Sequence, residues 1–304
     1  MASNASNASN ASNASNASNA SNAGIAGETG GGWVLAERAD LPFVMALDSA
    51  NNPLGGQRRP NPVSFSDWRW TAVWYAYRVL HELVQTTDWK LEADAAMTPA
   101  WAGVTLGGTA AEHDNLTRAA RDERAAALGE ILAQDGEFVT EFMALLSIVP
   151  GTHPRTYRVL HIAGLVALFA AMYYKDLRDR PRPSQVVPAL MPPIPVPGHA
   201  SWPSGHAAQA RLMALCADRV LDASAMNPAD RIVFQENLYA LAARIGRNRE
   251  IAGLHFPSDT TAGVALANSL FNTLINVHTG PSMTPLPIIG TFNGAISDAA
   301  NEWS

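Results

Sequence analysis

The chain has 304 residues and a formal net charge of −6, and 47% of its residues are hydrophobic. This apolar fraction is enough for a sizeable core and excludes a wholly disordered chain. The net negative charge disfavours sequence-independent binding of nucleic acid, which needs a basic surface. The single cysteine, Cys216, excludes an intramolecular disulfide and a cysteine-rich metal site.

The N-terminal part of the chain predicts little regular structure. Residues 2–22 are repeats of Ala-Ser-Asn, whose side chains cannot offset the entropy lost on ordering. We therefore predict a disordered low-complexity tail over residues 1–23 and a single domain over 24–304, in which residues 24–65 wrap the surface as an irregular arm. No basic segment followed by an apolar one comes after Met1, so no signal peptide is visible and the localisation stays open between cytoplasmic and secreted.

Beyond the arm the pattern predicts an all-α fold, a helical bundle. Helices are expected over residues 66–88, 114–134, 136–149, 155–179, 204–222, 228–248 and 258–277. Alternating runs of Val, Ile and Thr are missing, which argues against a sheet. The prolines of residues 181–203 predict a stiff, extended connector without helix, and residues 279–304 are expected to pack irregularly on the surface.

The longest apolar run extends from Val159 to Tyr174 and is shorter than the roughly 20 residues of a membrane-spanning helix. We therefore expect a buried core helix there and no membrane span. Trp68, Trp70, Trp74 and Tyr75 follow one another at near-helical spacing, which favours a core or interface role over a substrate platform. Such an interface, together with the arm, would suit a homo-oligomer.

Three segments at the ends of predicted helices carry groups suited to binding a tetrahedral oxyanion. They contain Lys175 and Arg182, then Ser204, Gly205 and His206, and then Arg249, His255 and Asp259. A Ser-Gly pair at a helix start offers backbone N–H groups and the positive end of the helix dipole, and Arg and Lys add charge. An Asp beside a His fixes the tautomer of the imidazole. Each segment alone has a structural alternative, such as a helix cap, but together they favour an oxyanion site.

The three segments also resemble a known family signature. The patterns are Lys175-x6-Arg182-Pro183, Pro203-Ser204-Gly205-His206 and Arg249-x5-His255-x3-Asp259. In order and spacing they are similar to the signature of the type 2 phosphatidic acid phosphatase and vanadium-dependent haloperoxidase superfamily. One position departs from it, since Asn248 stands where the family usually has Ser.

The resemblance implies a helical bundle with the site at helix ends, and it implies a role for each residue. Lys175, Arg182, Ser204, Gly205 (through its N–H) and Arg249 would hold the oxyanion. His255 would bond its central atom and be the ligand of a bound vanadium. Asp259 would orient His255, and His206 would be the general acid and base.

Two chemistries fit this resemblance. In a vanadium-dependent haloperoxidase, vanadate on His255 would polarise hydrogen peroxide, and bromide or iodide would be oxidised to hypohalous acid that reacts with an organic acceptor. In an acid phosphatase, a phosphate monoester would react through a phospho-His255 intermediate while His206 protonates the leaving alcohol. A non-catalytic oxyanion-binding protein is the third reading.

His199, five residues before Ser204, favours the first chemistry. Brominating members of the family look similar there, with a His at that position, and a second imidazole beside the oxyanion could hydrogen-bond peroxide. The alternatives are that His199 is a solvated loop residue before a turn, or a residue of a phosphatase that has no special role. On the sequence we rank haloperoxidase first and phosphatase second.

Overall fold

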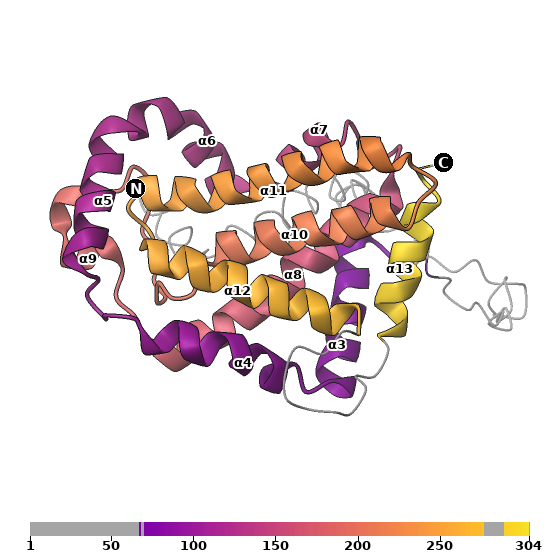
Figure 1. Ribbon diagram of the computed structural model, residues 1–304, viewed down its shortest axis with the longest axis horizontal. Coiled ribbons are helices and arrows are strands. Elements are labelled where there is room, and N and C mark those ends of the chain that lie inside the picture. The colour runs from indigo at the N-terminus through magenta and orange to yellow at the C-terminus, as the bar shows by residue number, and fades with distance from the viewer. Residues whose placement is uncertain (1–66, 68–69, 277–288, 304) are drawn as a thin grey trace, which may run out of the picture.

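The computed structural model of the chain describes residues 67, 70–276 and 289–303 (Figure 1). These residues form a helical bundle, and the described ranges contain no strand, so the predicted all-α fold is confirmed. The tail and the arm lie outside the described residues. The predicted tail, arm and single domain over 24–304 therefore stay predictions.

The middle of the bundle is formed by four long helices. They are α8 (Pro154–Arg178), α10 (Gly205–Asp222), α11 (Pro228–Ile251) and α12 (Pro257–Leu274). α10 contacts the other three, and Figure 1 shows α10, α11 and α12 running side by side. Buried alanines along α10 allow these close approaches. All four helices lie within a few residues of their predicted bounds.

One glycine permits the tightest of these approaches. A Cβ on Gly263 of α12 would lie 2.5 Å from the backbone oxygen of Ser204, directly before α10. A larger residue would push α12 away from the start of α10. The start of α12 is thereby held beside the start of α10.

α8 is the buried core helix that the sequence predicts. Among the described residues, Pro154–Val186 is the one stretch long and apolar enough to cross a membrane by length and composition, with a mean hydropathy of 1.4. The 18-residue window that gives this hydropathy is 67% buried inside the bundle. Its apolar side chains pack in the main core with those of α10 and α12.

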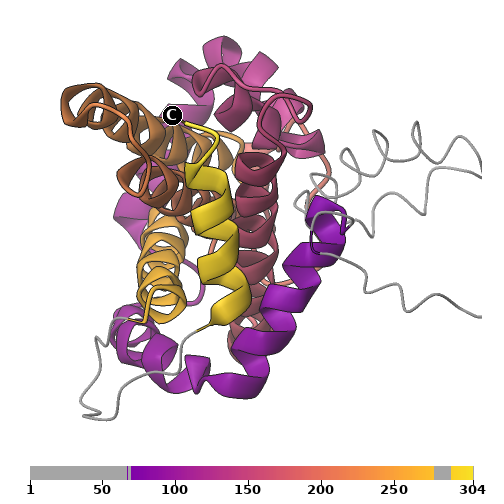
Figure 2. The same ribbon diagram turned by 90° about the vertical axis from the view of Figure 1, so that its right-hand side faces the viewer.

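Helices α3 (Ala72–Thr86), α4 (Trp89–Ala102) and α13 (Gly290–Ala300) cover this centre. α3 and α13 contact α8, and α4 contacts α12; Figure 2 shows α13 at the end of the bundle. The prediction of irregular packing over 279–304 is wrong for α13, because its apolar face, including Phe292 and Ile296, is buried on the bundle. The sequence did not predict α4, whose low amphipathicity hides its helical period.

α3 also starts later than predicted, at Ala72, because the side chain of Thr71 caps it by accepting from the backbone N–H of Trp74. Its aromatic residues divide between the core and the surface. Tyr75 is buried, whereas Trp70 and Trp74 are 37% and 56% exposed. Of the predicted core or interface role, the core is therefore excluded for these two, and the interface stays a prediction. Trp68 lies outside the described residues.

The predicted helix over 114–134 is two helices, α5 (Ala110–Asp122) and α6 (Arg124–Gly136), which meet at Glu123. The break turns the chain so that both helices contact α11. The short helix α7 (Val139–Leu145) occupies part of the predicted 136–149 helix.

The proline-rich connector is not wholly extended, which corrects the prediction for 181–203. It contains the short helix α9 (Pro183–Val186) and a 3₁₀ helix, Pro188–Leu190. A proline stands at the first position of each, where a missing N–H costs no helical hydrogen bond. Residues 191–203 are irregular.

Candidate active site

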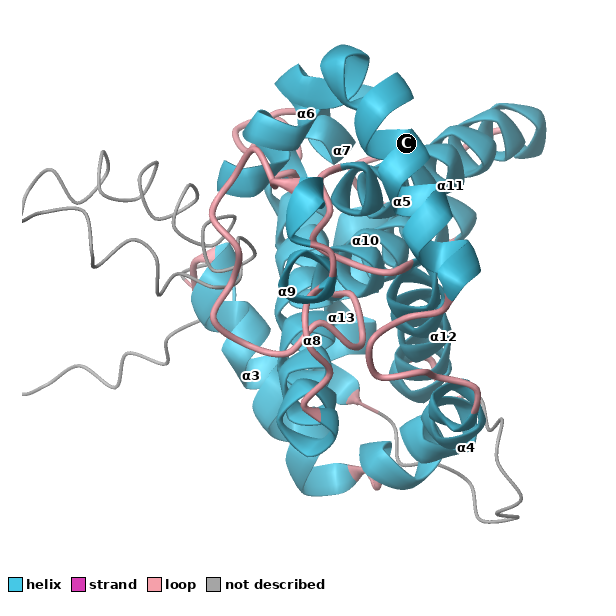
Figure 3. Ribbon diagram, turned by 90° about the vertical axis from the view of Figure 1, so that its left-hand side faces the viewer, coloured by secondary structure: helices cyan, strands magenta, loops and turns pink. Residues whose placement is uncertain are grey.

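The ends of four helices meet around a small cavity at one end of the bundle. α8 and α11 end there, and α10 and α12 begin there; Figure 3 faces this end, with α9 in front of α10. The cavity is lined by Leu168, Met172, Lys175, Arg182, Pro197, His199, Gly205, His206, Gln209, Arg249, Leu254 and His255. Its volume of about 20 Å³ gives room for little more than one small ion. The fold thus brings most of the predicted site residues to one place.

Two of the lining cations are held by backbone oxygens. Lys175 Nζ donates to the carbonyl oxygens of Ala200 and Ser201, at 2.8 and 2.9 Å. Arg182 Nη1 donates to the carbonyl of Leu254 at 2.9 Å. Burial lowers the pKa of Arg182 to about 10, so it stays charged at neutral pH. Burial, with the nearby charge of Arg182, lowers the pKa of Lys175 well below its ordinary value.

Arg249 is the cation whose hydrogen bonding is least complete. It is fully buried, and its Nη2 donates to the carbonyl of Ile131 at 2.9 Å. Its Nε and Nη1 have no hydrogen-bond partner among the described residues. Burial lowers the pKa of Arg249 to about 10, which leaves it charged at neutral pH. Two buried donors on a charged group that lines a cavity are suited to an anion, since leaving them unsatisfied costs free energy.

His255 is held in one tautomer. Its Nδ1 lies 3.4 Å from Oδ2 of Asp259, and its Nε2 accepts from Arg182 Nη1 at 3.1 Å. Because an Arg can only donate, Nε2 carries the lone pair and Nδ1 the hydrogen. Burial, and then the charges of Arg182 and Lys175, lower the pKa of His255 well below its ordinary value. A neutral imidazole with its Nε2 lone pair on the cavity side is suited to bond an electrophilic atom.

Asp259 lies outside the cavity lining and is itself held by Arg180. Arg180 Nη1 donates to Asp259 Oδ1 at 2.5 Å and to Ser258 Oγ at 2.8 Å. Its Nη2 donates to the carbonyl of Thr105, and its guanidinium lies over the ring of Phe256. Arg180 therefore acts on the site through Asp259 and is a positioning residue.

His206 lies at the start of α10 and shares the cavity with His255. Its Nε2 donates to the carbonyl of Gln134 at 3.2 Å, and its ring packs on Phe138. In the neutral ring the lone pair is therefore on Nδ1, which is the nitrogen left to exchange a proton with a ligand. Burial and the charge of Arg249 lower the pKa of His206 well below its ordinary value.

Ser204 and Gly205 have different places. Ser204 is the N-cap of α10 and its Oγ accepts from the backbone N–H of Ala207 at 3.4 Å. It is not among the residues that line the cavity. The capping role that the sequence left as an alternative is present, and a role of its hydroxyl as an oxyanion donor stays a prediction. Gly205, the first residue of α10, lines the cavity and brings a helix N-terminus to it.

His199 lines the cavity from the proline-rich connector. Arg182 Nη2 donates to His199 Nδ1 at 3.0 Å, and Arg182 Nε donates to its carbonyl oxygen at 3.1 Å. His199 is therefore not a solvated loop residue. One guanidinium contacts both His199 and His255.

The comparison with known families gives one match. Residues 157–280 match the PAP2 superfamily, a range that contains all three signature segments. Residues 157–280 form a PAP2 superfamily domain. The superfamily includes phosphatidic acid phosphatases and vanadium haloperoxidases, and it binds oxyanions such as phosphate and vanadate. No curated protein matches the chain.

Sequence reasoning missed several residues around the site of this PAP2 domain. Leu168 and Met172 line the cavity at helical spacing before Lys175, and Gln209 follows His206 by three residues. That periodicity was the signal that could have found them.

Gln134 left no such signal, because it lies in α6, remote in sequence from all three motifs. Its Nε2 donates to both oxygens of Glu141 at 3.0 Å. Its Oε1 accepts from Asn248 Nδ2 at 3.0 Å and lies 3.5 Å from Arg249 Nη2. Gln134 thus contacts Arg249 through its side chain and His206 through its carbonyl.

Proposed function

We propose that the chain is a vanadium-dependent haloperoxidase that oxidises bromide or iodide with hydrogen peroxide. The observation that carries this proposal is the place of His199, which shares one cavity and one guanidinium with His255. A phosphate ester needs one nucleophile and one acid, which His255 and His206 supply. A third imidazole adds a group that can bind and orient a second small reactant such as peroxide.

The donor set fits vanadate. The buried Nε and Nη1 of Arg249, which have no partner among the described residues, can donate to anion oxygens. Lys175, Arg182 and the N–H of Gly205 would supply further donors, and His255 Nε2 the nitrogen ligand. When bound there, vanadate supplies Lewis acidity that polarises peroxide without changing oxidation state.

The residues of the chain then have separate tasks. The Nε2 lone pair of His255 now accepts from Arg182 Nη1, and one lone pair cannot serve two partners. Arg182 Nη1 must therefore redirect its hydrogen bond to an anion oxygen as His255 bonds the central atom. His206 Nδ1 is placed to take or return a proton, because its Nε2 hydrogen is held by Gln134.

A second candidate is an acid phosphatase, which is favoured by His206 and His255 lining the same cavity. In that reaction His255 Nε2 would form a bond to phosphorus as the ester P–O bond breaks. The leaving oxygen would take a proton from His206, and water would then hydrolyse the phospho-His255. The cations would stabilise the charge on the phosphoryl oxygens.

A paired assay separates the two candidates. One preparation is given hydrogen peroxide, bromide and a phenol-type trap with and without vanadate, and separately an aryl phosphate between pH 4 and 8. We expect bromination that requires vanadate and is lost in His255→Ala but kept in His81→Ala, a histidine outside the cavity. Phosphate release without vanadate-dependent bromination would replace this proposal by the phosphatase. Oxyanion binding with neither turnover would leave a binding protein.

A further inference from the structure

An apolar groove runs along the outer side of α8, between α8, α3 and the start of α4. It is lined by Tyr77, Leu80, Val84, Trp89, Lys90, Leu165, Leu168, Phe169, Met172 and Tyr173, and its volume is about 550 Å³. Residues of α3 at spacings of three and four face residues of α8 at the same spacings, so two apolar stripes form its walls. A volume of this size is typical of sites for small organic molecules.

The groove and the oxyanion cavity share part of their lining. Leu168 and Met172 belong to both, and both side chains are only half-buried. Lys175 lies three residues beyond Met172 on the same face of α8, inside the cavity. An apolar site therefore borders the charged site directly, separated by two flexible aliphatic side chains.

The chemistry of the groove is almost wholly apolar and rich in aromatic rings. The rings of Phe169 and Tyr173 pack on that of Trp89 at centroid distances of 5.3 and 5.4 Å. Among its described lining residues the one charged group is Lys90, whose Nζ lies 4.6 Å from the Tyr173 ring centroid. Such a surface gains free energy by covering hydrocarbon or an aromatic ring, and it offers little to a polar ligand.

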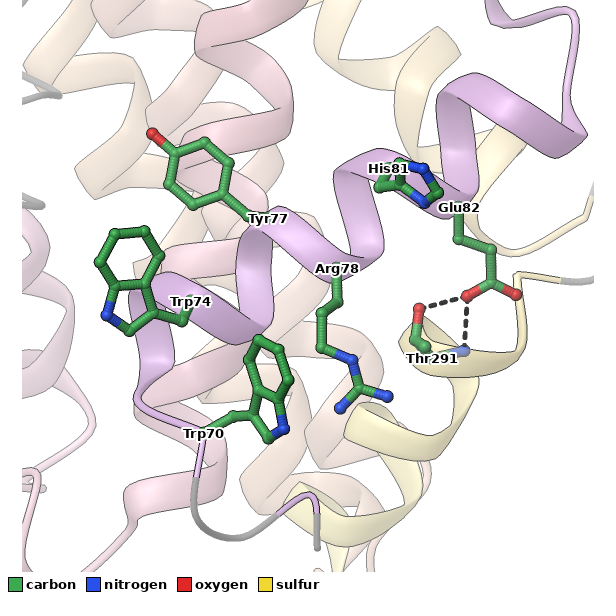
Figure 4. A pocket seen from close by; sticks show the side chains of 7 residues that line it. All are labelled: Trp70, Trp74, Tyr77, Arg78, His81, Glu82 and Thr291. Atoms are coloured by element: carbon green, nitrogen blue, oxygen red, sulfur yellow. Dashed lines mark hydrogen bonds between the residues drawn. The ribbon is translucent and has the colours of Figure 1, made fainter. Parts of the chain in front are cut away.

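A neighbouring hollow between α3 and α13 shares only Tyr77 with the groove among the described residues. In Figure 4 Tyr77 extends from α3 away from Glu82, whose carboxylate points to Thr291. Glu82 accepts from the N–H groups of Gly290 and Thr291, so its charge holds α13 to α3. Among the described residues the hollow shares no lining residue with the oxyanion cavity, whereas the groove shares Leu168 and Met172 with it.

We propose that the groove binds the apolar part of an organic substrate, whose reacting end lies beside Leu168 and Met172 at the oxyanion cavity. This inference rests on the proposed function, in which the substrate is the organic acceptor of the oxidised halogen. Hypobromous acid would transfer Br⁺ to a ring carbon of the held acceptor; the ring C–H proton and the hydroxide of hypobromous acid leave as water. The shared wall favours this occupant over a peptide or a second copy, neither of which would need a groove that borders the charged cavity.

Binding tests the groove without turnover. The dissociation constants of inorganic phosphate, ethyl phosphate, decyl phosphate and 1-decanol are measured by calorimetry, below the concentration at which the decyl compounds form micelles. We expect decyl phosphate to bind at least ~50-fold more tightly than ethyl phosphate, because each buried methylene contributes up to about fourfold. Equal dissociation constants for decyl phosphate and ethyl phosphate would overturn the proposal.

A matched pair of variants locates the effect. Val84 lies in the groove and is 40% exposed, whereas Val233 is 58% exposed on α11, outside both linings. Val84→Asp should remove most of the gain from the decyl chain and leave the affinity for inorganic phosphate within about twofold, and Val233→Asp should change neither. Equal effects of the two variants would refute the groove. Failure of inorganic phosphate and vanadate to bind would refute the oxyanion function instead, and Val84-dependent binding of 1-decanol would then still support the groove.

Turnover distinguishes a held acceptor from a released oxidant. In competition under bromination conditions, phenol and 4-octylphenol meet free hypobromous acid with similar ring reactivity. A groove-bound acceptor gives a preference for 4-octylphenol of at least ~10-fold in the wild type, and Val84→Asp should abolish it while Val233→Asp keeps it. Equal bromination of both phenols by the wild type would show release of the oxidant and contradict the proposal.

Discussion

Two buried charged regions lie next to each other at the same end of the bundle and differ in how their hydrogen bonds are satisfied. Around Arg180, the guanidinium is matched by Asp259, Ser258 and backbone oxygens. Around the cavity, Arg249 is as deeply buried but keeps two donors that have no partner among the described residues. Removing one partner of a fully paired buried charge destabilises the fold, whereas unpaired buried donors that line a cavity are suited to bind a ligand.

The largest expected effect is the loss of stability on removing the ion pair between Arg180 and Asp259. Arg180→Ala leaves Asp259 buried beside His255 without its ion pair, which should lower the free energy of unfolding by about 3–5 kcal/mol. Urea denaturation measures it. Arg219→Ala removes an exposed pair with Asp222 and should cost less than about 1 kcal/mol. Similar losses for the two variants would contradict the structural role of Arg180.

A substitution in the cavity region should change the affinity for the ligand more than the stability of the fold. Arg249→Ala removes donors that would bind the oxyanion, and each charge-assisted hydrogen bond contributes about 1.5–3 kcal/mol. We expect the dissociation constant of vanadate or phosphate to rise roughly 30- to 100-fold, with a smaller loss of stability in the ligand-free protein than for Arg180→Ala. Calorimetric titration checks the first and urea denaturation the second. The reverse order of the two effects would show that Arg249 is structural.

The low pKa values of the cavity histidines give a proton signature. In the ligand-free protein, His206 and His255 have pKa values well below their ordinary value, because burial and nearby cations disfavour their charged form. The unfolded chain then binds more protons below about pH 6.5, so the free energy of unfolding falls as the pH is lowered through that range. A bound dianion should offset the charge of the cations and so raise both pKa values.

Binding of sulfate, which does not titrate in this range, should therefore be accompanied by net proton uptake at mildly acidic pH. Calorimetry in two buffers with different heats of ionisation measures this uptake. His206→Gln should reduce it, whereas His81→Gln, on the exposed face of α3, should not. Proton release on sulfate binding would contradict the proposed electrostatics.

The smallest expected effect is that of a substitution at Asn248, the position at which the chain departs from the family pattern. Asn248 Nδ2 donates to Glu130 and to Gln134, whose Oε1 also lies near Arg249. Serine would keep at most one of these bonds, so Asn248→Ser should weaken oxyanion binding about three- to fivefold. Asn268→Ser, at an exposed contact with Arg211, is the matched control and should leave the affinity unchanged.

The sequence predicted the long central helices, whereas the place of the site at helix ends of the bundle was implied by the family resemblance. The local pattern was sufficient for the helices, because hydrophobic periodicity and helix-start residues act locally. It failed at α13, where burial against α8 rather than local pattern decides the helix, and within 114–134, where the break at Glu123 serves contacts with α11. The tertiary partners of these segments are far away along the chain.

For the site, the sequence by itself determined which charged and imidazole groups are available, since the signature spacing contains Lys175, Arg182 and Arg249. Only the tertiary structure decided which of these groups have hydrogen-bond partners within the protein. It made Ser204 the N-cap of α10, paired Arg180 with Asp259, and left two donors of Arg249 without a partner among the described residues. The physical reason is that the hydrogen-bonding state of a buried group depends on partners, such as Gln134 and the proline-rich connector, that approach it only when the helices pack.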